Sequence, residues 1–169
     1  MKQFKSILLA TALFFGALSF TQAQSKVAHI NTQDLVKGMP DMKTAKSELE
    51  KVAKTYENDI QAMATELQNK IKQYDAEAST KTDEENQKRL EEVQGMEQSI
   101  RQYQAQAQQD LQKKELDLLK PITEKAKAAI LKVGRAQGFE YVLDSSDGAG
   151  VILSDGKDLL NDVKKELGF

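Results

Sequence analysis

Few residues in this sequence could do covalent chemistry. The only histidine, His29, lies in a β-rich stretch, where a lone imidazole is far more often a packing or surface residue than a catalytic base. The chain has no cysteine, so thiol nucleophiles, thiolate metal sites and disulfides are excluded. No glycine-rich Walker loop is present either. We therefore expect neither an enzyme nor a nucleotide-driven machine.

One acidic segment invites a metal-site interpretation. Residues 144–155 read DSSDGAGVILSD, in which aspartates surround glycines. The segment lacks the ligand spacing and terminal glutamate of an EF-hand, so a solvent-exposed turn between two strands is favoured. We expect no metal and no cofactor.

The N-terminal residues have the layout of a secretory signal peptide. Lys2 and Lys5 precede an apolar run from Ile7 to Phe20, which is too short to span a bilayer, and small residues follow. We expect cleavage near Ala23, so that residues 1–23 are removed and the mature chain is exported. The alternative is an uncleaved N-terminal anchor.

The charge balance argues against a nucleic-acid partner. Removing Lys2 and Lys5 from 24 basic residues leaves 22, against 26 Asp and Glu, so the mature chain carries a net charge of −4.

Two long helical patterns occupy the middle of the chain. From Asp41 to Ala78, apolar residues recur every three or four positions, with an eleven-residue repeat visible at Leu49, Ile60 and Ile71. About 38 helical residues extend for about 57 Å. A capping box at Thr82 and Glu85 then starts a second helix. The segment between them, Ala78 to Asp83, is predicted to be the tip of an antiparallel hairpin.

The positions of the two prolines agree with this predicted hairpin. With Lys81 at the tip, Pro40 and Pro121 lie at the same height, where each should mark an irregularity at the base of the hairpin. The same alignment places Ile60 near Arg101 and Tyr103, and Ile71 near Leu90 and Glu91. Gly95 is predicted to be either a flexible point or a site of close packing against Leu67.

The two flanking segments must form a body together. KVAHINT is β-rich, and two further strands are predicted at Phe139 to Leu143 and Gly150 to Leu153, joined by a turn. Gly138 ends the preceding helix, and a short amphipathic helix with Leu159, Leu160, Val163 and Leu167 on one side closes the chain. Since this core is small and has no disulfide, we expect it to be shared between subunits.

The predicted fold class is therefore α+β, a small β-containing body with a long antiparallel α-helical hairpin that we call the prong. The body comprises residues 24–40 and 121–169, and the prong comprises residues 41–120.

The order of these segments resembles the Skp/OmpH family of periplasmic chaperones. The resemblance is carried by KVAHINTQDLVKGMP, by the polar hairpin, and most specifically by PITEKAKAAILKVGRAQGFEYVLDSSDGAGVILSDGKDLLNDVKKELG after the prong. It implies a periplasmic homotrimer whose prongs surround a cavity, and ATP-independent holding of unfolded outer-membrane proteins. The resemblance also implies a strongly basic prong, whereas 13 Lys and Arg against 17 Asp and Glu give residues 41–120 a net charge of −4.

The residues proposed for these roles fall into two groups. The candidates for client binding combine flexible thioethers, amphipathic rings and basic groups: Met42, Met63, Tyr74, Met96, Tyr103, Lys43, Lys46 and Lys54. The candidates for trimerisation are apolar residues of the predicted strands: Val27, Ile30, Phe139, Tyr141, Leu143, Val151 and Leu153. Contact with lipid or lipopolysaccharide through local lysine clusters stays open.

Two other functions compete with the chaperone. A prefoldin-like protein also presents helical hairpins, but works in the cytosol, which the signal peptide argues against. A structural coiled-coil spacer or adaptor of the bacterial envelope would use the prong as a tether with a fixed partner at the tip. The tip sequence EASTKTD has no large apolar anchor, which favours the chaperone.

Overall fold

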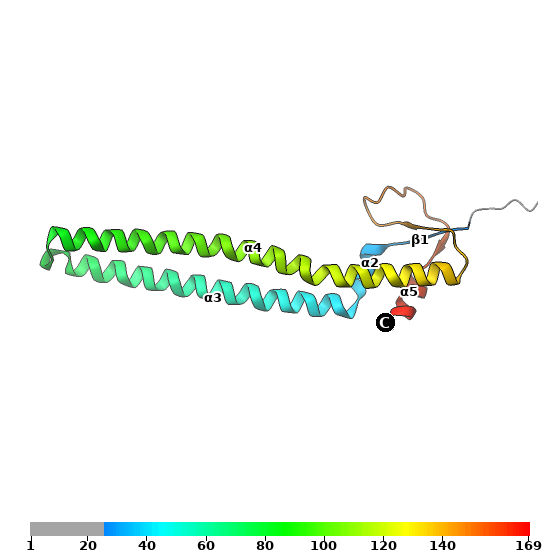
Figure 1. Cartoon of the computed structure of the whole chain (residues 1–169), viewed down its shortest axis with the longest axis horizontal. Helices are drawn as coiled ribbons and strands as arrows, with labels where there is room; N and C mark the ends of the chain where they lie inside the picture. The colour runs from blue at the N-terminus through cyan, green and yellow to red at the C-terminus, as the bar shows by residue number, and fades with distance from the viewer. Residues whose placement is uncertain (1–25) are drawn as a thin grey trace, which may run out of the picture.

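Two long helices running side by side dominate the molecule. The computed structural model describes residues 26–169, so the predicted signal peptide and its cleavage near Ala23 lie outside the described residues. Helix α3 (Pro40–Glu77) and helix α4 (Asp83–Ala136) form the antiparallel hairpin, which projects from a small body (Figure 1). No helix in the described part of the chain is long and apolar enough to cross a membrane.

The tip of the hairpin has the predicted structure. A short 3₁₀ helix, η2 (Ala78–Thr80), follows α3, and Thr82 then caps α4. The Thr82 hydroxyl accepts a hydrogen bond from the Glu85 backbone N–H, and the Glu85 carboxylate accepts one from the Thr82 N–H. This reciprocal capping box satisfies two N–H groups that would otherwise lack partners.

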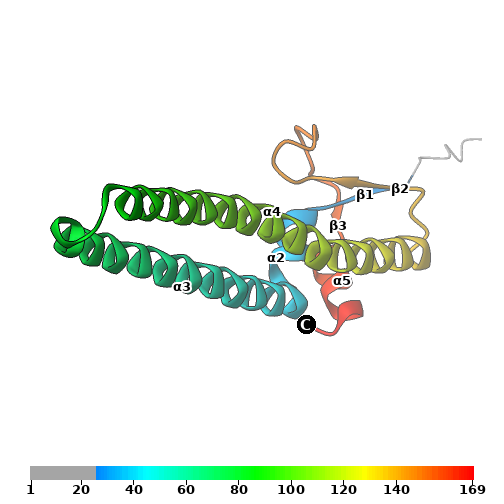
Figure 2. The same ribbon diagram turned by 60° about the vertical axis from the view of Figure 1, so that its left-hand side comes forward.

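The body contains a three-stranded sheet that joins the two ends of the described chain. Strand β1 (Val27–Ile30) lies between β2 (Tyr141–Asp144) and β3 (Lys157–Asp158), and pairs with both in parallel. Figure 2 shows the sheet at one end of the hairpin, beside the last turns of α4. Helices α2 (Thr32–Gly38) and α5 (Leu160–Leu167) complete the body.

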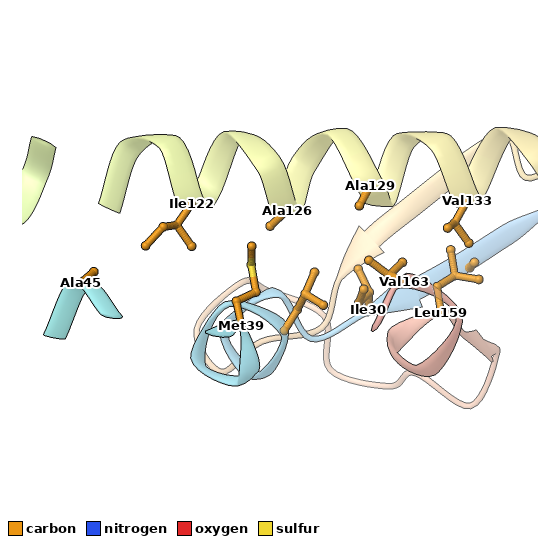
Figure 3. Packing of buried hydrophobic residues seen from close by; sticks show 11 residues of the cluster. Ile30, Met39, Ala45, Ile122, Ala126, Ala129, Val133, Leu159 and Val163 are labelled. Carbon is orange, nitrogen blue, oxygen red and sulfur yellow. The ribbon is translucent and has the colours of Figure 1, made fainter. Parts of the chain in front are cut away.

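The core lies where these elements meet α4. Figure 3 shows apolar side chains from β1, α4 and α5 converging on one another. The innermost side chains are Ile30, Leu35, Met39, Leu159 and Val163. The last two confirm the predicted inner side of the C-terminal helix. Gly134 allows β2 to approach α4 closely, because a Cβ there would lie 2.9 Å from Val142 Cγ2.

Two predictions about the strands were wrong. Gly150 to Leu153 forms no strand, and the predicted hairpin is replaced by a long connection between two parallel strands. Gly148 and Gly150 adopt positive φ, which turns the chain, and no strand within residues 26–169 pairs with the segment. The strand predicted from Phe139 begins at Tyr141, because the Phe139 N–H instead donates to the Gly134 carbonyl at the end of α4.

The two prolines differ in effect. Pro40 begins α3, where a missing N–H costs nothing, as predicted for the base of the prong. Pro121 lies inside α4, which continues through it to Ala136 as one helix. A single helix therefore runs from the tip of the prong through Pro121 into the body.

Candidate functional site

Most of the prong's apolar seam is only half buried. Of the described residues 41–120, only Ala45 and Ala107 are buried, and the larger apolar side chains of the seam remain partly exposed. The fold-over register is close to the predicted one, with Tyr103 bonded to Asp59 and Lys114 paired with Glu48 across the hairpin. A two-helix arm buries a narrow stripe, so other forces must hold the helices together.

Tyrosine–carboxylate hydrogen bonds supply part of that force. Tyr103 donates to Asp59 Oδ2 at 2.7 Å, and Tyr56 donates to Asp110 Oδ2 at 2.9 Å. The two rings meet edge to face with centroids 5.7 Å apart. Each hydrogen bond raises the pKa of its tyrosine, because the neighbouring carboxylate favours the neutral phenol. We call these four residues the tyrosine clasp.

A second polar cluster lies nearer the tip. Lys70 and Tyr74 of α3 both donate hydrogen bonds to the Glu92 carboxylate on α4. These two bonds lower the pKa of Glu92. The Arg89 guanidinium lies 4.5 Å from the centre of the Tyr74 ring and bonds to Glu77. Ion pairing and cation–π contact thus connect the two helices near the tip.

The structure places the client-binding candidates in different environments. Met63 and Met96 line one shallow depression together with Gly95. A Cβ at Gly95 would meet nothing within 4 Å, so the close-packing interpretation of this glycine was wrong. Tyr74 and Tyr103 are half buried and their hydroxyls are already bonded across the hairpin. Met42 packs against the body core.

The lysine candidates are exposed near the base of α3. Lys46 lies 4.0 Å from Glu50, and Lys54 lies 2.8 Å from Glu57. Lys43 lines a shallow hollow with Lys51 and Glu48. These lysines are mixed with carboxylates and do not form a continuous basic surface.

The trimerisation candidates divide according to the side of the sheet on which they lie. Val27, Tyr141 and Leu143 are exposed, with Tyr141 60 % accessible, and the register of β1 against β2 places them on the same face. Ile30 lies on the opposite face and is buried in the chain's own core, so its side chain is not available to a second subunit. Phe139 is half buried against that core.

The loop beyond β2 adds further apolar surface. Val151 is half buried, Leu153 is exposed, and Ile152 between them is fully exposed. Ile152 is not among the trimerisation candidates named from the sequence, although it is the most exposed of the three.

A partly buried polar network ties the end of β2 to the start of α2. Asp144 accepts hydrogen bonds from the backbone N–H and hydroxyl groups of both Thr32 and Ser146, at 2.6 to 3.3 Å. Burial would raise the pKa of Asp144, but these four bonds outweigh it and lower the pKa from 3.8 to about 2. Ser146 is itself only 4 % exposed. The network fixes the strand ends rather than forming an open site.

Comparison with known proteins agrees with this architecture. The model of the family described as outer membrane protein (OmpH-like) matches residues 26–167. The chain belongs to the OmpH-like family. This OmpH-like chain is 26 % identical over 163 residues to the chaperone protein Skp of Photorhabdus laumondii, covering 95 % of this chain and 98 % of the relative. It is 22 % identical over 155 residues to the chaperone protein Skp of Pectobacterium atrosepticum, covering 92 % and 93 %.

A solved structure shows the same fold. The crystal structure of a putative outer membrane chaperone (OmpH-like) from Caulobacter crescentus CB15 superposes with a TM-score of 0.77 at 18 % identity. The match covers 86 % of this OmpH-like chain and 85 % of the other. The resemblance drawn from the sequence is thereby confirmed at the level of family and fold.

Proposed function

We propose that this chain is an ATP-independent holding chaperone of the periplasm, which binds unfolded outer-membrane proteins and prevents their aggregation. One observation carries the proposal: an OmpH-like chain presents a long hairpin whose seam leaves apolar side chains half exposed and is lined by shallow open hollows. Its named relatives are chaperones. Shallow, repeated contacts suit clients that differ in sequence, whereas an enclosed pocket suits one ligand.

The working form in this proposal is a homotrimer. The open face of the sheet, with Val27, Tyr141 and Leu143, together with exposed Ile152 and Leu153, offers apolar surface suited to contact with other copies. Three prongs would then surround a cavity, and several weak contacts acting together would raise the effective concentration of binding surface around one client.

The proposal is tested with the mature chain beginning at Gln24. Its mass is measured by sedimentation, alone and after mixing with an outer-membrane β-barrel protein diluted from urea, with a folded protein as control. A trimer that keeps the unfolded barrel protein soluble and ignores the folded protein is expected. A trimer that lets the barrel protein aggregate would favour the envelope spacer instead.

The assembly has its own test. Tyr141→Asp places a charge on the open face of the sheet and should collapse the oligomer. The matched substitution Gln102→Asp, at an exposed position of the prong, should leave the mass unchanged. A trimeric Tyr141→Asp variant would show that this face is not the interface.

A further inference from the structure

A groove runs along one side of the hairpin, about midway between tip and body. It has a volume of about 530 Å³ and lies between α3 and α4. Small side chains at Ala53, Ala64 and Ala107 leave the hollow, and Ile60 and Leu111 provide larger apolar surface. Ala107 is one of the two buried residues of the prong, so the floor is part of the helix seam.

Glutamines border this apolar floor. Gln61 of α3 and Gln104 and Gln108 of α4 line the groove, and all three are exposed. Within the described part of the chain their side-chain amides have no hydrogen-bond partner, whereas the neighbouring Gln106 donates to Asp110. Each free amide offers two N–H donors and one carbonyl acceptor. The rim can therefore bond to groups of either kind.

The groove is also nearly free of charge. Its only charged residue is Glu57, which is paired with Lys54 at 2.8 Å. The depression lined by Met63 and Met96 is different, since Glu66, Lys70 and Glu92 surround it. A charged ligand would lose hydration in the glutamine-lined groove without gaining a counter-charge. An uncharged occupant matches it better.

We propose that this groove binds an extended, uncharged stretch of unfolded polypeptide with alternating apolar and polar side chains. Its apolar side chains would contact the floor, and its unpaired backbone N–H and C=O groups would bond to the glutamine amides. Membrane β-strands have this alternation, with about 10 residues per strand. The inference rests on the proposed chaperone function and assigns part of the client binding to one surface.

This mode of binding differs from attraction between opposite charges in its dependence on salt. Hydrogen bonds between neutral groups and apolar contacts are not screened by ions, whereas exposed charge pairs are. Binding of a neutral strand-like peptide to the full mature chain should therefore change less than about twofold between about 50 mM and about 500 mM salt.

The test uses a fluorescent, uncharged peptide of about 10 residues that alternates Val, Leu or Tyr with Thr or Ser, with fluorescence anisotropy as the readout. In the double variant Gln104→Glu/Gln108→Glu, two nearly isosteric substitutions add charge to the rim. We expect the dissociation constant to rise at least about fivefold. The control Gln98→Glu/Gln102→Glu adds the same charge with the same spacing, at exposed positions that do not line the groove, and should bind like the parent.

The outcomes separate this inference from the chaperone proposal. If the parent chain keeps the barrel protein soluble and both double variants bind the peptide equally well, the groove is not the site and the holding function stands. A neutral peptide that binds much more weakly than an acidic or basic one would also overturn the inference. If the parent chain binds neither peptide nor barrel protein, the chaperone proposal itself fails. Circular dichroism and sedimentation mass verify that the variants are folded and assembled.

Discussion

The body and the prong of this protein are held together by different forces. In the body, Leu35, Leu159 and Val163 are completely buried, and β1 is hydrogen-bonded on both edges. In the prong, two alanines are the only buried residues, and the helices are joined by the tyrosine clasp and by ion pairs such as Lys114–Glu48. Burial of large apolar side chains stabilises a fold far more than exposed polar contacts do.

The proposed function would use this difference in two ways. A body with a tight apolar core fixes where the prong starts, and a prong joined by polar contacts can open locally at low cost. It also leaves apolar groups near the surface, where an unfolded client would reach them under the proposed function. The comparison predicts that a substitution in the body will change the free energy of unfolding strongly. An equivalent substitution in the prong should have a small effect that stays local.

The largest effect is expected in the core of the body. Leu159→Ala removes a side chain with no exposed surface and should lower the free energy of unfolding by about 3 kcal/mol. Urea unfolding at one fixed protein concentration measures the change. Leu116→Ala, at a position that is 68 % exposed on α4, is the control and should cost less than about 0.5 kcal/mol. Equal losses would contradict the comparison.

A smaller effect is expected at the polar network of the body. Asp144→Asn removes a carboxylate that accepts four hydrogen bonds and should cost about 1 to 2 kcal/mol at pH 7. The pKa of Asp144 is lower in the folded state than its ordinary value of 3.8. Its stabilisation is therefore present at pH values well above 3.8 and is lost as the pH falls through 3.8 and then through about 2.

The free energies of unfolding of the parent and of Asp144→Asn should therefore approach each other at low pH. Urea unfolding of both proteins between pH 7 and pH 2 measures this. Asp147→Asn changes an exposed aspartate three residues along the loop and should follow the parent at every pH. If the stability difference for Asp144→Asn stayed constant down to pH 2, its carboxylate would not be the stabilising group.

The tyrosine clasp should affect the prong alone. Tyr56→Phe/Tyr103→Phe removes both hydroxyls and leaves the ring contact in place. Amide hydrogen exchange in the middle of α3 and α4 should become about threefold faster, while exchange in β1 stays unchanged. Tyr141→Phe, at an exposed tyrosine of the body, should leave the prong unaffected. Faster exchange throughout the body would show that the two regions are coupled.

The smallest effect is expected at Gly95, and it should be stabilising. A Cβ at this position meets no atom within 4 Å, and alanine restricts the unfolded chain more than glycine does. Gly95→Ala should therefore raise the stability of the prong by about 0.5 kcal/mol. Thermal unfolding followed by circular dichroism measures it, and Gly134→Ala, which meets Val142, should instead destabilise. If Gly95→Ala lowered the stability of the prong, the open space around this position would not be enough to accommodate a side chain.

The prong could be predicted from the sequence because its signals are local. The capping box at Thr82 and Glu85 marks the tip, and the apolar repeat through Leu49, Ile60 and Ile71 sets the seam. Folding about that tip already places Tyr103 beside Ile60, one residue from its partner Asp59. The clasp could have been found by checking the residues next to the seam for complementary polar groups.

The body was harder to predict because its contacts join distant segments. β1 pairs with residues more than 110 positions later, and no local pattern indicates whether that pairing is parallel. The apolar run Val151 to Leu153 has the composition of a strand, but none of the described strands pairs with it. The glutamine-lined groove was equally hidden, since it depends on which faces of two helices meet.

The position of β1 in the sheet also constrains when this protein can become functional. The central strand is synthesised near the start of the described chain, and both of its neighbours are synthesised near the end. The hairpin can form before the rest of the chain is ordered, because its contacts lie within one continuous segment. The sheet cannot form until Lys157 and Asp158 return to β1. The arm can therefore form first, and the base that anchors it is complete only when the two ends of the described chain meet.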